Sequence, residues 1–310
     1  MQFAYSWMNQ YRKAGVYRLF LLFFSSLLAG KVYATEIILS DTEDSRALRS
    51  FTQSLAEQRP QDTVRFVESK QLGDLSKLSP ESRLILLGPQ ALAHRLKQKQ
   101  GPPTLILRVS RVQAYSLLQN SHPDNISLLW SDPPLHRQLR LAHELLPRGR
   151  RIGALYSDQS VFLIEELQQA AKALGLQIIE QQWPEKRDNR PLQQLLTSSD
   201  LLIGLDDPKL FNPLTIKSLL LSSYAHQRAL IGPTVGYVKA GSLASSYSDE
   251  ADWLKTLNEL LDQSPRNWPL GQYSRYFKVR GNPQVARALG IELASDEELT
   301  RRLTSGEPRP

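Results

Sequence analysis

Residues 151–182 read RIGALYSDQSVFLIEELQQAAKALGLQIIEQQ, in which two apolar runs flank a segment with helical periodicity. The runs, at residues 151–157 and 176–182, have the length and composition of buried β-strands. Between them, over residues 161–174, apolar side chains recur at i, i+3, i+7 and i+10 and so share one helix face: Ile164, Leu167, Ala171 and Leu174. Gly175 follows as a helix stop. The stretch therefore predicts a strand–helix–strand unit with parallel strands.

The same alternation extends to both sides of this unit. Five candidate strands precede it, at residues 36–40, 64–67, 83–88, 104–109 and 126–131. Helical segments are expected between them, at residues 45–58, 90–98 and 112–119. Three more strand candidates follow it, at residues 200–205, 229–232 and 242–247. Because a chain of 310 residues exceeds the usual ~100–200 of one domain, we expect an α/β fold of two Rossmann-like lobes with parallel sheets, joined by a hinge.

Amphipathic helices indicate the limits of the two lobes. A helix over residues 135–146 closes the first lobe, which we expect to cover residues 35–147. The second lobe covers residues 148–249, and a helix at residues 250–262 returns the chain to the first lobe. Two further limits are expected: a segment that completes the second lobe at residues 266–292, and a disordered polar tail at residues 304–310.

The N-terminal residues have the pattern of a secretion signal. Three positive charges precede an apolar core, LFLLFFSSLL at residues 19–28, and small residues occupy the cleavage positions before residue 35. The core is shorter than the roughly 20 residues that cross a bilayer, so we expect residues 1–34 to be cleaved as a signal peptide. Retention as an anchor is the alternative. The chain has no cysteine, which excludes disulfides and a lipid-carrying cysteine. Together these features predict a free periplasmic protein.

Charge and motifs argue against two classes of protein. The formal charge is +7, and residues 1–34 hold four basic side chains and no acidic one, which leaves +3 for the rest of the chain. That charge is too small to indicate binding of nucleic acid. The HExxH spacing of metalloproteases, the lysine of a phosphate-binding loop and the GxSxG turn of serine hydrolases are all missing. We therefore expect no catalytic activity, no metal and no cofactor.

Several segments in the second half resemble one known family. They are His143–Pro147 (HELLP), Arg151–Tyr156 (RIGALY), Ala170–Leu176 (AAKALGL), Val235–Ala244 (VGYVKAGSLA) and Gln284–Ile291 (QVARALGI). In order and spacing they are similar to the substrate-binding proteins of ABC transporters that have the type I periplasmic-binding-protein fold. The resemblance implies capture of a small organic solute in a cleft between the lobes, delivery to an inner-membrane ABC permease, and a monomer.

Strand ends supply the candidate ligand contacts. In open parallel sheets, ligands lie outside the carboxyl ends of the strands. In this chain we expect the following residues to face the cleft: Asp41, Gly88 and Asp132 from the first lobe, and Tyr156, Ser157, Asp158, Asp206, Asp207 and Tyr237 from the second. Helix capping is the alternative role of each serine and aspartate. The recurrence of aspartate predicts a ligand with a cationic group or several hydroxyls, because a carboxylate buried without a partner is unfavourable.

The resemblance leaves the ligand open. The family often has Asn after Leu-Tyr, where this chain has Ser157, and an Asp-Asn pair, where it has Asp206-Asp207. A second function is also compatible with the sequence: a periplasmic sensor or accessory binding protein that presents its surface to a membrane receptor and takes no part in transport.

Overall fold

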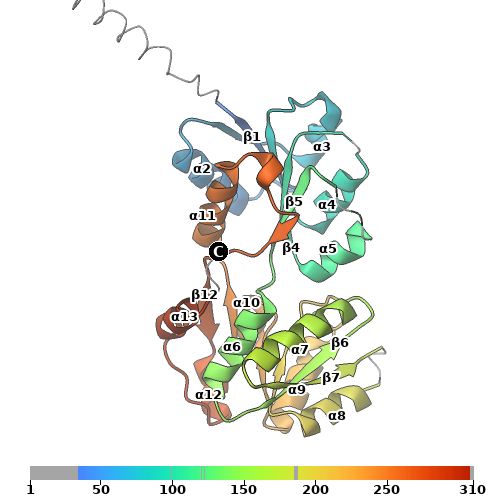
Figure 1. The fold of residues 1–310 in the computed structure, drawn as a ribbon, viewed down its shortest axis with the longest axis vertical. Coiled ribbons are helices and arrows are strands. Elements are labelled where there is room, and N and C mark those ends of the chain that lie inside the picture. Colours follow the sequence, from blue (N-terminus) through green and yellow to red (C-terminus); the bar gives the residue numbers. More distant parts are fainter. Residues whose placement is uncertain (1–33, 99, 120, 122, 185–187, 308–310) are drawn as a thin grey trace, which may run out of the picture.

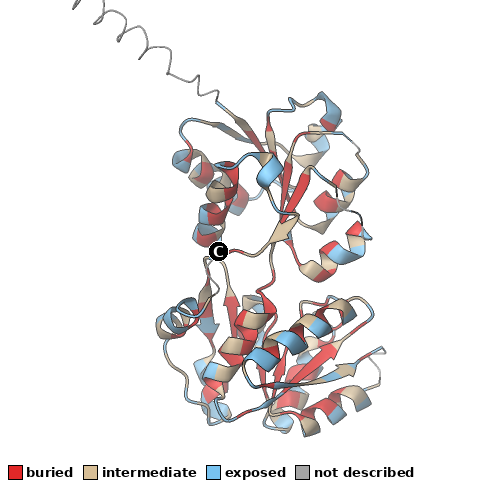
Figure 2. Ribbon diagram, in the orientation of Figure 1, coloured by how far each residue is buried: buried red, intermediate tan, exposed pale blue. Residues whose placement is uncertain are grey.

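The computed structural model describes residues 34–98, 100–119, 121, 123–184 and 188–307. It shows two α/β lobes stacked along the long axis of the molecule, each built on one six-stranded sheet (Figure 1). The central strands of each sheet form the buried centre of its lobe, whereas the edge strands are partly exposed (Figure 2). The predicted fold class is therefore confirmed. The expected signal peptide lies outside the described residues except for Ala34. Within those residues, no helix combines the length and the apolar character needed to cross a membrane.

The first lobe has the strand order β11-β5-β4-β3-β1-β2, and every neighbouring pair is parallel. Its strands are β1 (Glu36–Ser40), β2 (Thr63–Phe66), β3 (Arg83–Leu87), β4 (Thr104–Val109), β5 (Ile126–Trp130) and β11 (Gly271–Gln272). Its helices are α2 (Arg46–Gln58), α3 (Ser69–Leu72), α4 (Pro89–Leu96), α5 (Arg111–Leu118) and α11 (Glu250–Leu261). One apolar cluster joins α2 and α11 to the sheet, and a second joins α4 and α5 to it.

The second lobe has the order β12-β10-β9-β8-β6-β7, in which only β12 runs antiparallel to its neighbour. Its strands are β6 (Arg151–Tyr156), β7 (Gln177–Gln182), β8 (Leu201–Ile203), β9 (Ala229–Ile231), β10 (Ala244–Tyr247) and β12 (Lys278–Gly281). Its helices are α6 (Leu135–Leu145), α7 (Ile164–Ala173), α8 (Arg190–Ser198), α9 (Ile216–Ala225), α10 (Val235–Ala240), α12 (Pro283–Ala288) and α13 (Asp296–Thr304).

The strand–helix–strand unit at residues 151–182 is confirmed. β6 and β7 pair in parallel along their full lengths, from Arg151 opposite Gln177 to Tyr156 opposite Gln182. The helix between them begins as a short 3₁₀ turn at Val161–Leu163 and continues as α7. The predicted apolar face is buried, with Leu167 and Ala171 fully covered. Local periodicity was sufficient for the helix because its apolar side chains form one continuous stripe. The run at residues 177–182 forms a strand, but none of its residues is fully buried.

The lobe limits differ from the expected ones at two places. Helix α6 packs against α7, β10 and α13, so it belongs to the second lobe and the chain crosses before residue 135, not after residue 147. An apolar stripe shows that a helix packs on a sheet but does not say on which one. Within the segment expected to complete the second lobe, β11 pairs with β5 of the first lobe, and only the chain from β12 onward joins the second.

Ordered structure also extends further toward the C-terminus than expected. Thr304 ends helix α13, and the Glu307 carboxylate accepts hydrogen bonds from Arg137, so the chain from residue 304 to 307 is not disordered. Residues 308–310 lie outside the described part. The polar composition of this segment does not reveal that Glu307 binds Arg137, which lies 170 residues away in the sequence. At residues 235–240 the chain forms the helix α10.

Candidate functional site

The strand-end loops of the two lobes meet at the middle of the molecule. The hydroxyl of Ser110, after β4, donates to the backbone oxygen of Asp206, after β8, at 3.4 Å. This contact joins the carboxyl ends of the two sheets, which is where an open parallel sheet places its ligand. Candidate residues of both lobes therefore share one interlobe region.

Asp132 is a buried carboxylate at the carboxyl end of the first-lobe sheet. It follows β5, is 8% exposed, and accepts a hydrogen bond from the backbone N–H of Arg111 at 2.8 Å. Burial raises the pKa of Asp132 to about 7, and the negative charge of Asp206 adds to this effect. The site therefore disfavours the ionised form of this side chain unless a cation approaches it.

Asp206 lies on the opposite lobe and shares this property. Burial raises the pKa of Asp206 to about 6, the neighbouring Asp207 raises it further, and Ser110 opposes the shift. Among the described residues, no lysine, arginine or histidine forms an ion pair with Asp132 or Asp206. Two carboxylates from opposite lobes thus lie within electrostatic range of each other without a cationic partner of their own.

Arg111 is the nearest cationic side chain, and it is already engaged. Its guanidinium donates to the Glu166 carboxylate at 2.7 Å and to the Tyr273 hydroxyl oxygen at 3.1 Å. Burial and the nearby Asp132 charge raise the pKa of Tyr273 above its usual value. Because Glu166 belongs to the second lobe, this arginine bridges the lobes and leaves the negative charge of Asp132 only weakly compensated.

Asp207 and Ser157 are held by the chain itself. The carboxylate of Asp207 accepts hydrogen bonds from the hydroxyls of Ser157 and Ser160, both at 2.6 Å, and from the backbone N–H of Lys209 at 2.8 Å. Asp207 is fully buried. These contacts fix the loops after β6 and β8 relative to each other, a structural role different from the helix capping considered as the alternative in the sequence analysis.

The remaining candidates of the second lobe lie around the same loops. Tyr156 ends β6 and is partly buried against the lobe core. The Tyr237 hydroxyl donates to the backbone oxygen of Phe211 at 2.6 Å, and burial raises the pKa of Tyr237 to about 12. Asp158 is exposed and pairs with Lys209 at 2.6 Å. That ion pair borders a cavity of about 260 Å³ at the ends of β6 and β7.

In the first lobe, Gly88 and Asp41 end two neighbouring strands. Gly88 precedes α4 with a φ of 89°, a conformation that favours glycine, and its backbone N–H and C=O are both hydrogen-bonded within the lobe, to Leu107 and Leu92. Asp41 follows β1 and lies 3.6 Å from the guanidinium of Arg108. Sequence analysis missed Arg108, Arg111 and Tyr273. The one available signal was a single charged residue, Arg108, in the otherwise apolar strand TLILRV.

Comparison with known proteins identifies the architecture. No protein-family model matches the chain, and no curated protein sequence matches it. Among solved structures, a substrate-binding protein with adhesive properties from Clostridium difficile, in its ligand-free, open form, matches with a TM-score of 0.64 and 18% identity, over 85% of this chain and 97% of that one. The chain has the type I periplasmic-binding-protein fold.

Two further structures support this assignment of fold. An ABC domain from Streptococcus pneumonia in complex with L-Trp matches with a TM-score of 0.56 and 18% identity, over 86% of this chain and 98% of that one. A conserved domain protein from Vibrio cholerae matches with the same TM-score and identity, over 87% and 98% of the two chains. In each case nearly the whole of the other protein is covered, so both lobes and their order along the chain are shared.

Proposed function

We propose that this chain is a periplasmic solute-binding protein for an ABC-type importer, and that its ligand carries a cationic group bound between Asp132 and Asp206. The observation that carries the proposal is a pair of carboxylates, the buried Asp132 and the half-buried Asp206, one from each lobe, with raised pKa values. A protonated amine between them would restore the ionised form of both and would join the lobes at the same time. Ligand binding would therefore favour the closed arrangement.

The shared fold supports this proposal. The Streptococcus protein of the same fold was solved with L-Trp, a molecule that has an ammonium group. For this chain we extend the likeness only to the charged end of the ligand, because the two chains are only 18% identical.

A thermal-shift screen at pH 8 tests the proposed ligand class. We expect primary amines such as putrescine, agmatine and L-lysine to include stabilising ligands, whereas neutral sugars and nucleobases have no effect. A ligand at 100 times its Kd adds about 2.7 kcal/mol, which corresponds to a rise in Tm of roughly 5–10 °C for a chain of this size. Asp206→Asn and Asp132→Asn should abolish the shift. Asp188→Asn is the matched control, since that carboxylate is not among the expected ligand contacts and is paired with the exposed Arg190, and it should keep the shift.

Two results would contradict the proposal: stabilisation by sugars or nucleobases without any amine, or unchanged amine binding in Asp206→Asn. The transport role is tested separately. Deletion of the gene should slow uptake of the radiolabelled ligand, whereas a sensor would alter gene expression and leave the uptake rate unchanged.

A further inference from the structure

A cavity of about 180 Å³ lies in the first lobe at the carboxyl ends of β3 and β4. Its walls come from the first turns of α2 and α11 and from the ends of these two strands. The lining is mainly apolar, with three polar side chains at its rim: Ala47, Leu48, Phe51, Leu87, Leu107 and Trp253, with Arg108, Ser248 and Glu250. A dry cavity of about 150 Å³ can hold a benzene molecule. This cavity therefore has room for an apolar chain of several carbon atoms.

Arg108 reaches this rim from a strained position. Its φ is 59°, in the left-handed region that disfavours residues with a Cβ. It lies where the pairing of β4 with β5 shifts register, between Ile106 and Val109. Such bulges redirect a side chain and are common next to binding sites. The Arg108 side chain is 60% exposed and forms an ion pair with Asp41 at 3.6 Å, which is beyond hydrogen-bond distance, so its N–H donors remain available to a ligand.

The strand order sets the distance between this arginine and the acidic pair. Asp132 follows β5 and Asp41 follows β1, and the order β5-β4-β3-β1 separates these strand ends by three spacings. At about 4.8 Å each, the separation is about 14 Å. Arg108 extends from β4, which lies on the Asp132 side of β1, and its guanidinium is 3.6 Å from Asp41. The guanidinium is therefore roughly 10 Å from the Asp132 carboxylate. The apolar ends of β3 and β4 lie between them.

We propose that this cavity is a second part of the ligand site and that the ligand is an extended zwitterion. This inference rests on the proposed function. The cationic group lies at Asp132 and Asp206, an apolar chain crosses the strand ends, and an anionic group binds Arg108. Glu250, also at the rim, is exposed at the first turn of α11, where the helix N-terminus favours its charge. The ligand class is an ω-amino acid or a short apolar peptide whose charges lie about 10 Å apart.

Two isomers separate this ligand class from ordinary amino acids. 8-Aminooctanoate and 2-aminooctanoate have the same atoms and charges and differ in the distance between the charges, while octylamine lacks the anion. By calorimetric titration at pH 8, we expect 8-aminooctanoate to bind at least tenfold more tightly than either of the others. Quenching of Trp253 fluorescence should accompany binding, because this side chain lines the cavity. Trileucine tests the peptide source, since three extended residues span about 10 Å.

Arg108→Gln should reduce the affinity for 8-aminooctanoate to that of octylamine. Arg108→Gly should do the same without lowering the Tm of the free protein, because glycine adopts a φ of 59° freely, so unfolding cannot explain the loss. Arg65→Gln is the control for charge: Arg65 is half-exposed and pairs with Glu36 at the opposite end of the sheet.

Equal affinity for the two isomers, or a preference that survives in Arg108→Gln, would overturn this inference. If simple amines bind and the extended isomer has no advantage, the inference fails and the proposed function stands. If no amine of any length binds, the proposed function itself fails.

Discussion

At the scale of single residues, Asp132 should make the stability of the free protein depend on pH. Burial raises its pKa from 3.8 to about 7, so the folded state binds the proton more tightly than the unfolded state does. The ionised Asp132 carboxylate therefore lowers the free energy of unfolding, and this effect is absent below pH 4 and grows as the pH rises to about 7. Because one pKa unit corresponds to about 1.4 kcal/mol, the total is a few kcal/mol.

Asp132→Asn removes this effect and keeps an oxygen to accept the Arg111 N–H. We expect the variant to raise the Tm of the ligand-free protein at pH 8 and to leave it nearly unchanged at pH 4, as measured by calorimetry at both pH values. Asp158→Asn provides the comparison, because Asp158 is exposed. Equal changes in Tm at pH 4 and pH 8 would mean that the Asp132 carboxylate is not the source of the pH dependence.

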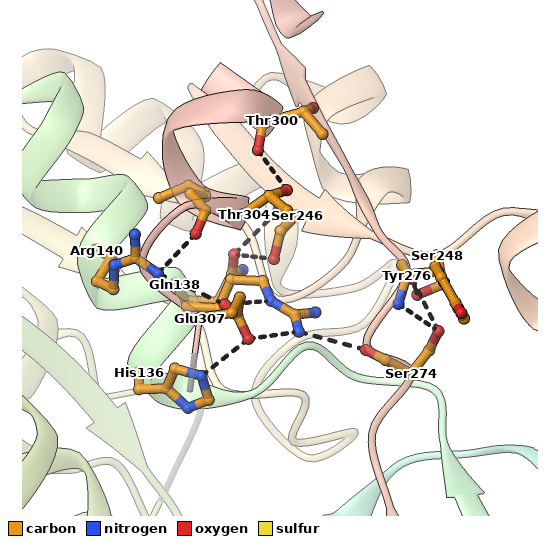
Figure 3. A network of polar contacts seen from close by, with 12 residues as sticks. His136, Gln138, Arg140, Ser246, Ser248, Ser274, Tyr276, Thr300, Thr304 and Glu307 are labelled. Atoms are coloured by element: carbon orange, nitrogen blue, oxygen red, sulfur yellow. Dashed lines mark hydrogen bonds and ion pairs between the residues drawn. The ribbon is translucent and has the colours of Figure 1, made fainter. Parts of the chain in front are cut away.

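At the scale of elements, Glu307 joins the end of α13 to α6 and to the last crossing between the lobes (Figure 3). Its carboxylate accepts from Arg137 at 2.9 and 3.0 Å and faces His136 at 3.3 Å. Arg137 is 3% exposed, lies 3.8 Å from the Phe277 ring centre, and donates to the backbone oxygen of Ser274. A buried guanidinium thus depends on one carboxylate for its neutralisation.

Glu307→Gln should lower the free energy of unfolding by about 2–4 kcal/mol at pH 7, because it leaves the Arg137 charge buried without a counter-charge. The adjacent charges lower the pKa of Glu307 from 4.5 to about 2. The stabilisation that the Glu307 carboxylate gives the folded state is therefore complete above pH 4.5 and is lost as the pH falls toward 2. Urea denaturation at pH 7 and pH 2.5 measures both effects. Glu292→Gln, at an exposed position, is the control, and a loss of similar size there would contradict the role of Glu307.

At the scale of the whole molecule, α5 of the first lobe and the start of α7 in the second hold the lobes together (Figure 1). Tyr115 stacks on Phe162 with ring centres 4.1 Å apart, and Arg111 pairs with Glu166 at 2.7 Å. An aromatic pair of this kind contributes about 0.5–1.5 kcal/mol. An exposed ion pair contributes up to about 1 kcal/mol. The two contacts favour closure without preventing the lobes from separating to admit a ligand.

The double variant Phe162→Ala, Glu166→Gln should shift the free protein toward an open form by roughly 2- to 70-fold in population, as expected for a loss of about 0.5–2.5 kcal/mol. Small-angle X-ray scattering should then give a larger radius of gyration for the free variant, and saturating ligand should restore the smaller value. Leu221→Ala, at an exposed position on α9, is the control. An unchanged scattering profile for the double variant would show that these contacts do not hold the lobes together.

The sequence was sufficient for the features that depend on short-range order. The 3.6-residue stripe of α7 and the apolar runs of β6 and β7 predicted a strand–helix–strand unit, and its parallel register is confirmed. The rule that ligands lie at carboxyl strand ends named Asp132 and Asp206 among nine candidate contacts, because a strand end can be recognised from its own neighbours. That these two bind the ligand is our proposal.

Tertiary structure was needed wherever a residue's role depends on a distant partner. The stripe of α6 fits either sheet, and only packing assigns the helix to the second lobe. The polar tail gains order because Glu307 meets a buried arginine 170 residues away. Of five strand-end aspartates, Asp132 and Asp206 have a raised pKa, whereas Asp207 is hydrogen-bonded within the chain and Asp41 and Asp158 are ion-paired. Burial and charge at a site are sums over neighbours brought together by folding, and sequence spacing does not contain those distances.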